Sequence, residues 1–294
     1  MKLVTFRYEG TEMVGVLNRE ENGIYPVSAA GLPYASMNEL ILHMTPEEKA
    51  ALGTMVQEEK AEWIPADQTE KMAPIPRPIQ DVVCLGINYT AHAEEAARYQ
   101  SEAFGGERPA AIYFSKRVNQ AVADGGEIDS HPGLVERLDY EAELGVIIGK
   151  DAKNVPLEEA FDYVFGYTVI NDVSARVIQT KHKQWYFGKS LDTFTPMGPC
   201  ITTADEIAAP PALKIQAYVN GALRQDSNTS LLINDIPHVI SELSQGMTLE
   251  AGTVIATGTP AGVGMGMTPP TFLKPGDEVT CYIEGIGKIT NKVK

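Results

Sequence analysis

The alternation of hydrophobic and polar side chains predicts strands at both ends of the chain. Near the start, KLVTFRY, EMVGVLN and GIYPV (residues 2–27) alternate with a period of two and are separated by Glu-Gly and Glu-Asn-Gly turns. Near the end, LKIQAYVNGALRQD predicts a hairpin with Asn220-Gly221 at its turn. The last segment, PGDEVTCYIEGIGKITNKV, predicts a pair of strands that turn at Gly285.

Two helices and a proline-rich break follow the first strands. Residues 37–43 and 46–60 are predicted to be helical, and the second segment carries acidic residues at its start, where they oppose the positive end of the helix dipole. The three prolines of APIPRPI exclude a helix interior or a central strand. We therefore divide the chain into a small N-terminal domain, a linker and a main domain, with the bounds 1–73, 74–80 and 81–294.

The main domain is predicted to be β-rich, with few and scattered helices. DVVCL, AIYFSKR and FGYTVIND favour strands, and VIATGTPAGVGMGM favours a strand that enters a glycine-rich loop. Helices are predicted from Asn88 to about Tyr99, over PLEEAFDYV and over INDIPHVISELSQGMTL, and residues 101–110 are predicted to form a mobile, polar loop. Because no βαβ unit repeats, we predict an α+β fold with a mixed β-sandwich or roll and a small N-terminal α/β domain.

The segment LDYEAELGVIIGK (138–150) places acidic side chains at alternate positions. On a continuous strand Asp139, Glu141 and Glu143 share one face, because successive side chains point to opposite faces. Like charges at this spacing oppose folding unless water or a cation compensates them. A strand with one wet face and a site for a hard divalent ion, which prefers carboxylate oxygens, are the two interpretations.

The segment VSARVIQTKHK is predicted to be a helix with Asn171 or Asp172 as its N-cap. Asp172, Arg176 and Gln179 then stand at i, i+4 and i+7 on one helical face. An acid, a fixed cation and an amide projecting together are typical of a site that recognises a metal-bound anion. His92 and Glu95 lie at i and i+3 of another predicted helix, where such pairs occur both as catalytic dyads and as solvated surface pairs.

Composition narrows the class of protein. The chain has 294 residues, 44% hydrophobic and 21% charged, which is typical of a globular protein. A net charge of −15 argues against a general nucleic-acid or anionic-membrane surface. The three cysteines form no CxxC pair and are expected to be buried and reduced in a cytoplasmic protein. No apolar run reaches the length of a signal peptide or a membrane span.

Two motif classes are not supported. Gly262, Gly264 and Gly266 give a GxGxG pattern, but no Rossmann βαβ unit surrounds it and the Walker lysine pattern is absent, so nucleotide binding is not expected. No G-x-S-x-G elbow indicates a serine hydrolase.

Several motifs in order resemble the fumarylacetoacetate hydrolase family. They are GINYTAHAEE, RLDYEAELGVII, NDVSARVIQ, FGKSLDTFTPMGP, TGTPAGVG and PGDEV…IEGIGKITN, and they span about 81–293. The resemblance implies a mixed β-sandwich roll, usually dimeric, so a homodimer is expected. One position departs from the family, because Val177 stands where members often carry an acid after Ser-Ala-Arg. We expect this change to affect helix packing or specificity, not metal binding.

The resemblance also implies roles for particular residues. Glu141, Glu143 and Asp172 resemble the ligands of Mg²⁺ or Mn²⁺, with Ca²⁺ as a further option, and Asp139 resembles a supporting acid. The positions that resemble substrate contacts are Arg176, Gln179, Lys189 and Thr259, with Lys189 also stabilising developing charge. His92 and Glu95 resemble a catalytic dyad on a segment that closes over the site.

These parts predict a metal-dependent enzyme that acts on small anionic 2-oxo acids through a metal-bound enolate. Hydrolysis of a C–C bond in an acylpyruvate-like compound is the first expectation, as in aromatic catabolism. The alternatives are isomerisation of the 2-hydroxymuconate type and decarboxylation of oxaloacetate. A non-enzymatic alternative is a protein that a metal ion merely staples together. The loops at 99–110 and 263–272 are expected to set the distal part of the substrate.

Overall fold

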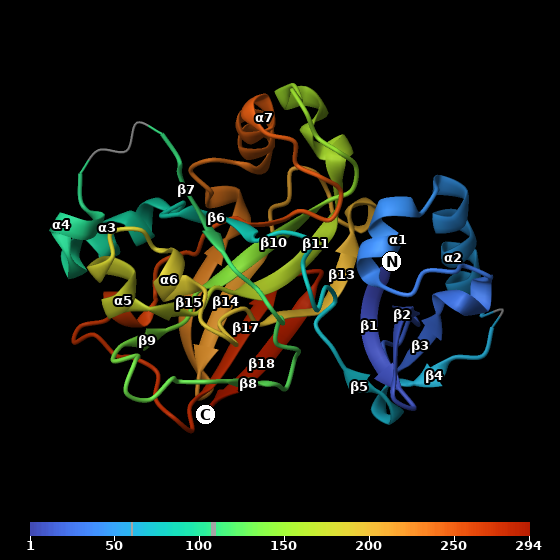
Figure 1. Ribbon diagram of the computed structural model, residues 1–294, viewed down its shortest axis with the longest axis horizontal. Helices are drawn as coiled ribbons and strands as arrows, with labels where there is room; N and C mark the ends of the chain where they lie inside the picture. The colour runs from blue at the N-terminus through green and yellow to red at the C-terminus, as the bar shows by residue number, and fades with distance from the viewer. Residues whose placement is uncertain (60, 107–109) are drawn as a thin grey trace.

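The computed structural model describes residues 1–59, 61–106 and 110–294. Within these residues, eleven strands form one mixed sheet that extends from the N-terminal segment, on the right in Figure 1, into the rest of the chain. Its strands, in order across the sheet, are β4 (Ile64–Pro65), β3 (Gly23–Pro26), β2 (Thr11–Leu17), β1 (Lys2–Tyr8), β13 (Met197–Thr203), β11 (Val164–Asn171), β10 (Ala142–Ile148), β16 (Val254–Ala256), β6 (Val82–Gly86) and β7 (Ile112–Lys116), with β5 (Glu70–Lys71) paired to β1.

A second sheet packs against the middle of the first. Its strands, in order, are β15 (Ala222–Asn228), β14 (Lys214–Val219), β17 (Glu278–Ile283), β18 (Gly287–Val293) and β8 (Glu127–Ile128). Strands β10 and β11 contact β14 and β17, and buried side chains such as Leu144, Val169 and Ile215 fill the space between the two sheets. The predicted β-rich α+β fold with a mixed β-sandwich is therefore confirmed.

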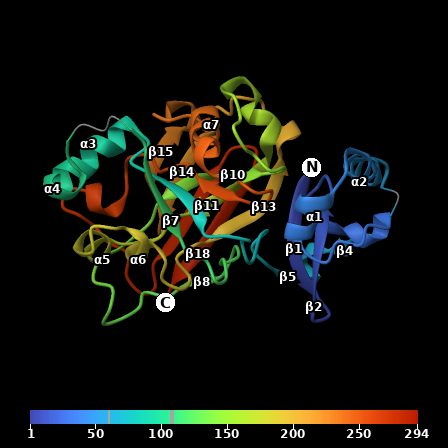
Figure 2. The same cartoon turned by 45° about the horizontal axis from the view of Figure 1, so that its top comes forward.

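The N-terminal strands share the large sheet with the main domain. Lys2 pairs with Thr202, and Leu3 pairs with Ile201, so β1 continues the sheet beyond β13. Helices α1 (Met37–His43) and α2 (Pro46–Glu58) cover these strands, as Figures 1 and 2 show. The expected helix 46–60 ends at Glu58, and residue 60 lies outside the described residues. The division into two domains stays a prediction, because one sheet runs through both parts.

The remaining helices are short and scattered along the chain. They are α3 (Thr90–Tyr99), α4 (Ser101–Phe104), α5 (Arg176–Lys181), α6 (Tyr186–Lys189) and α7 (Ile236–Gly246), with short 3₁₀ helices η1 (Val27–Ala30), η2 (Ala66–Gln68), η3 (Leu157–Tyr163), η4 (Ala204–Glu206), η5 (Thr229–Leu231) and η6 (Gly264–Gly266). In the described part of the chain, no helix is both long and apolar enough to cross a lipid bilayer. The three cysteines are buried and free, as expected.

Three local predictions were wrong in detail. The segment 138–150 is not one strand, because β9 (Leu138–Asp139) ends before β10 begins and pairs with β12 (Ser174–Ala175) instead. The helix after Asp172 begins only at Arg176, with Ala175 as its N-cap. Part of the expected loop at 101–110 forms α4, and residues 107–109 lie outside the described residues.

Candidate active site

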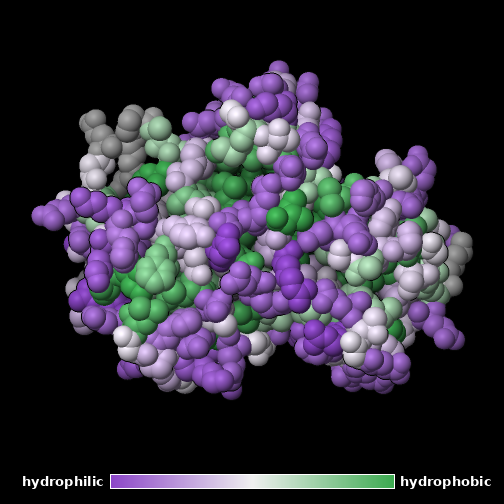
Figure 3. Space-filling view, viewed as in Figure 1, coloured by the Kyte–Doolittle hydropathy of each residue, from purple (hydrophilic) through white to green (hydrophobic). Residues whose placement is uncertain are grey.

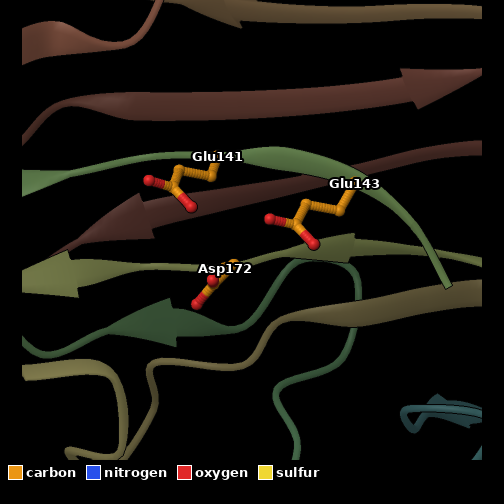
Figure 4. Close-up of side chains that lie close together, drawn as sticks. All are labelled: Glu141, Glu143 and Asp172. Carbon is orange, nitrogen blue, oxygen red and sulfur yellow. The ribbon is translucent and has the colours of Figure 1, made fainter. Parts of the chain in front are cut away.

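Three carboxylates meet where β10 and β11 pair. Glu141 and Glu143 flank Ala142 at the start of β10, so the period of two directs both side chains to one face. The register sets Ala142 against Asn171, and the N–H of Asp172 donates to the carbonyl of Glu141 at 2.8 Å. Figure 4 shows the three side chains gathered together, and oxygen atoms of all three lie within 4.8 Å of one another. All three are buried, so this face of the strand is not wet.

Three buried cations bind these carboxylates. The Nζ atom of Lys189 lies 2.7 Å from Oε2 of Glu141 and 2.6 Å from Oδ2 of Asp172. The Nη1 atom of Arg176 lies 2.6 Å from Oε1 of Glu141. The ammonium group of Lys116 contacts Oδ1 of Asp172 and also donates to two backbone carbonyl groups. Glu141 and Asp172 are therefore each paired with two cations.

The pKa values of the two glutamates shift in opposite directions. Burial alone would raise the pKa of Glu141, but the adjacent Lys189 and Arg176 lower it below its ordinary value. Burial raises the pKa of Glu143 well above its ordinary value, and the carboxylates of Asp172 and Glu141 raise it further. A backbone N–H from Gly258, at 2.9 Å, donates to Oε2 of Glu143. Glu143 is thus the acid in this cluster whose negative charge is least compensated.

The cluster has the composition of a site for a hard divalent cation. Among the described residues, the acids Glu141, Glu143, Asp172 and Asp139 are buried close to three buried cations and outnumber them by one. Carboxylate oxygens are the ligands that Mg²⁺ and Mn²⁺ accept. A divalent ion beside Glu143 would also offset the repulsion that raises its pKa. Glu141, Glu143 and Asp172 therefore fit such an ion.

Arg176 is held in place from two sides. Its Nε atom donates to Oδ2 of Asp139 at 2.9 Å, and its Nη1 atom donates to Oε1 of Gln179 at 3.2 Å. Its Nη2 atom is buried and has no hydrogen-bond partner in the described part of the chain. A buried guanidinium N–H without an acceptor is costly, so a ligand oxygen at this position would be stabilising.

Strand pairing brings Arg176 and Asp172 together, and a common helix does not. Asp172 precedes β12, whereas Arg176 and Gln179 are on α5, so the expected shared helical face is wrong for Asp172. Ser174 of β12 pairs with Asp139 of β9, and this pairing turns the start of α5 toward the carboxylates. Arg176 and Gln179 lie on one face, as predicted.

The glycine-rich loop 262–266 binds acidic side chains of the protein. The N–H of Gly262 donates to Oε2 of Glu95 at 2.9 Å, and the N–H groups of Gly264 and Met265 donate to the two oxygens of Asp139 at 2.7 and 2.9 Å. A Cβ atom on Gly266 would lie only 1.6 Å from Oε1 of Glu95, so a side chain does not fit there. The backbone of this loop therefore holds Glu95 and Asp139 in place beside the site.

Helix α3 places His92 and Glu95 in the interior. Both residues are about 3% exposed, and His92 lines the same cavity as Glu141 and Glu143. Burial raises the pKa of Glu95 to about 7, and the N–H of Gly262 partly offsets that effect. Of the two interpretations of His92 and Glu95, this burial excludes the solvated surface pair. The direct contact between His92 and Glu95 stays a prediction.

The cavity between these groups is small. It has a free volume of about 10 Å³, which is close to the minimum for one water molecule, roughly 10–15 Å³. Its charged and polar lining comprises His92, Glu141, Glu143, Arg176, Gln179, Lys189 and Thr259. Its apolar lining comprises Leu85, Gly86, Ile87, Phe104, Phe114, Trp185 and Met265. The structure thus brings seven of the nine predicted site residues to one cavity wall, with Asp172 and Glu95 directly behind it.

Sequence reasoning missed two buried polar residues of the site. Lys116 ends a predicted strand, and nothing in the local pattern indicates that it reaches Asp172. Gln225 connects Thr259 to the start of β10. Its side-chain N–H donates to Oγ1 of Thr259 at 2.7 Å, and its Oε1 atom accepts from the N–H of Ala142 at 3.0 Å. Gln225 gives no local signal either, because its strand, ALRQDSN, is polar along most of its length.

The fold and the carboxylate cluster agree with one protein family. The family model described as Fumarylacetoacetate (FAA) hydrolase C-terminal matches residues 81–294. The chain therefore belongs to the fumarylacetoacetate hydrolase family, and the predicted resemblance is confirmed.

Named relatives include enzymes with different reactions. The chain is 47% identical over 221 residues to "Oxaloacetate tautomerase YisK" of Bacillus subtilis (strain 168), which covers 75% of this chain and 72% of that protein. A fumarylacetoacetate hydrolase from psychrophilic Exiguobacterium antarcticum has a TM-score of 0.85 and 38% identity, covering 100% of this chain and 99% of that one. Maleylpyruvate hydrolase from Sphingobium sp. SYK-6, in complex with manganese (II) ion and pyruvate, has a TM-score of 0.77 and 30% identity, covering 100% and 98%.

Proposed function

We propose that this protein is a divalent-metal-dependent enzyme that interconverts the keto and enol forms of a short 2-oxo dicarboxylic acid, with oxaloacetate as the model substrate. The observation that carries the proposal is the buried Nη2 atom of Arg176, which lacks an acceptor among the described residues. Arg176 is one of the residues that line the cavity of the carboxylate cluster. A substrate carboxylate supplies that acceptor, and an anionic substrate balances the positive charge that a bound metal adds.

Glu141, Glu143 and Asp172 are the residues that would hold the metal, as Mg²⁺ or Mn²⁺. When bound, the ion supplies a Lewis acid that polarises the keto group of the substrate. The manganese in the related maleylpyruvate hydrolase supports this part of the proposal. Lys189 binds two of the same carboxylates and must give up part of these contacts when an ion is present.

The protein's own groups then move the proton. His92, on the cavity wall, takes the proton from the carbon next to the keto group, and the nearby Glu95 carboxylate stabilises the charged imidazole. Lys189 stays charged, because burial would lower its pKa but Asp172 and Glu141 raise it. Its Nζ atom donates to the oxygen on which negative charge develops. Returning the proton to that oxygen completes the enol.

Two observations favour proton transfer over the initially expected C–C hydrolysis. The cavity of about 10 Å³ requires side chains to move for any substrate, and each additional substrate carbon increases that displacement. Proton transfer also needs no attacking water molecule, so it requires less cavity volume than C–C hydrolysis. The 47% identity to an oxaloacetate tautomerase supports the same choice.

Hydrolysis of an acylpyruvate is the second candidate. The maleylpyruvate hydrolase that resembles this chain over its full length was solved with manganese and pyruvate. The same side chains serve that reaction if His92 activates a water molecule rather than removing a carbon-bound proton.

Homodimer formation and a cytoplasmic location belong to the proposal as well.

One assay separates these reactions. The purified protein, stripped of metal and then supplied with Mg²⁺ or Mn²⁺, is mixed with oxaloacetate and with a panel of acylpyruvates. Enol formation is followed by ultraviolet absorbance, and pyruvate is quantified by chromatography. We expect metal-dependent enolisation of oxaloacetate, inhibited by EDTA, without pyruvate release. A higher kcat/KM for cleavage of acylpyruvates would establish the second candidate, whereas no turnover of any 2-oxo acid would refute both.

A further inference from the structure

Trp185 lies directly against the backbone of Gly86. A Cβ atom added to Gly86 would lie 2.1 Å from the indole ring of Trp185, which is closer than any real contact. Gly86 ends β6, and Trp185 immediately precedes α6, which carries Lys189. The absence of a side chain at Gly86 therefore allows the indole to occupy the end of the strand beside the site.

Two phenylalanines fix the indole from its sides. Its ring centroid lies 5.8 Å from that of Phe104 and 5.2 Å from that of Phe114, in a tilted and an edge-to-face arrangement. Such aromatic pairs are favourable at these distances. The Nζ atom of Lys189 lies over the ring of Phe114, 5.3 Å from its centroid. The aromatic cluster therefore extends to the buried carboxylates and cations of the site. The packing of Trp185 against Gly86, Phe104 and Phe114 therefore fixes its side chain in the wall of the active-site cavity.

Trp185 is also shared by two cavities. It lines the active-site cavity of about 10 Å³, together with His92 and Arg176. It also lines an outer cavity of about 430 Å³, whose remaining lining is Gln100, Glu102, Ala103, Thr180 and Lys183. The side chain is partly exposed, which agrees with its contact with both the interior and the outer cavity.

We infer that Trp185 is the residue that limits substrate length, because its indole separates the active-site cavity from the outer cavity. The inference rests on the proposed 2-oxo acid function and narrows its substrates to short acids whose far end stops at the indole. When the indole is removed, the outer cavity receives the tail of a longer 2-oxo acid. Gly86 is required for this position of the indole, because a Cβ atom at residue 86 would overlap the ring.

Binding of non-reacting 2-oxo acid analogues tests the inference without depending on the reaction. Oxamate and N-alkyl oxamates of increasing chain length are titrated calorimetrically into the Mn²⁺-loaded protein. We expect affinity of the natural protein to fall at least tenfold from oxamate to N-butyl oxamate. In Trp185→Ala the difference should shrink to about threefold or less. Phe187→Ala is the matched control, because this neighbouring aromatic is exposed and lines neither cavity. Figure 3 shows apolar surface in the region of α5 and α6.

A second pair of variants guards against misfolding of Trp185→Ala. Gly86→Ala alone should weaken oxamate binding, because its Cβ displaces the indole. Gly86→Ala combined with Trp185→Ala should bind oxamate like Trp185→Ala alone. Equal affinity of the natural protein for short and long oxamates would overturn the inference and leave the proposed function standing. Failure of every oxamate to bind any variant would refute the proposed function and the inference with it.

Discussion

The ammonium group of Lys116 contacts Oδ1 of Asp172 in a completely buried ion pair. The other oxygen of the same carboxylate, Oδ2, lies 2.6 Å from the Nζ atom of Lys189. Each oxygen of Asp172 is therefore bound by a different cation, which fixes the orientation of the carboxylate. Lys116 also donates to the carbonyl of Phe194 at 2.9 Å, so the lysine itself is held by the backbone. It orients Asp172 from behind, because it does not line the cavity.

Lys116→Met should destabilise the protein and weaken metal binding. Methionine keeps much of the side-chain volume, but Asp172 stays buried with one cation fewer, and we expect the free energy of unfolding to fall by about 3 kcal/mol. Mn²⁺ should recover part of this loss, because a divalent ion supplies positive charge at the same carboxylate. Urea denaturation with and without Mn²⁺ measures both effects. Lys71→Met, in an exposed pair with Asp124, is the control and should have little effect.

Local patterns were sufficient for most of the backbone. The period of two predicted β1, β2, β14, β15, β17 and β18, because each of these strands pairs with a neighbour in the sequence. The hairpin at Asn220-Gly221 was predictable for the same reason, since both residues adopt the positive φ angles, 50° and 78°, that this turn requires. Strands that pair with a neighbour in the sequence can therefore be predicted from the alternation of side chains and from the turn residues between them.

Contacts between distant segments were not readable in the same way. The break before Glu141 arises because β9 leaves the large sheet to pair with β12, a pairing that no local pattern indicates. Asp172 was expected to join the site from a helix, but it does so from the end of β11. The resemblance to the family named the three acids that the structure brings together, whereas helical spacing gave the wrong reason for one of them.

Glu143→Gln and Glu141→Gln should have opposite profiles. Burial and the neighbouring carboxylates raise the pKa of Glu143 and so favour its neutral form, which glutamine imitates. We therefore expect little change in the free energy of unfolding without metal, but at least a tenfold loss of Mn²⁺ affinity. Glu141→Gln breaks contacts to Lys189 and Arg176 and should lower the metal-free stability by about 3 kcal/mol. Calorimetry measures the Mn²⁺ affinity, and urea denaturation measures the free energy of unfolding. Equal stability losses in the two variants would contradict the opposite pKa shifts that we assign to Glu141 and Glu143.

Glu95 should give stability a pH dependence of unusual sign. Burial raises its pKa to about 7 in the folded state, so between its ordinary value and pH 7 the folded protein binds more protons than the unfolded chain. This group therefore stabilises the fold less as the pH rises from its ordinary pKa to about 7, by on the order of 3 kcal/mol in all, and the loss is complete above that pH. Catalysis should show the reverse trend, because an ionised Glu95 is needed beside His92, and kcat/KM should fall as the pH drops through about 7.

Glu95→Gln separates the two effects. Glutamine keeps the acceptor for the N–H of Gly262 and does not titrate. The difference in unfolding free energy between this variant and the natural protein, measured from pH 5 to 8, should isolate the contribution of Glu95. The limb of the activity profile near pH 7 should also disappear from what activity remains. An unchanged limb in Glu95→Gln would assign it to another group.

His92→Ala should distinguish the chemical steps that share this site. Removing a general base costs roughly 10²- to 10⁴-fold in rate, so enolisation of oxaloacetate should lose at least about 100-fold in kcat. KM should change little, because Arg176 and Gln179 remain to bind the carboxylate. Hydrolysis of acylpyruvates needs the imidazole to activate water and should collapse equally, whereas decarboxylation, which requires neither base nor water, should survive. His238→Ala is the control, since its ring is exposed and paired with Asp235. Undiminished enolisation in His92→Ala would remove His92 from the mechanism and leave Lys189 as the group that transfers the proton.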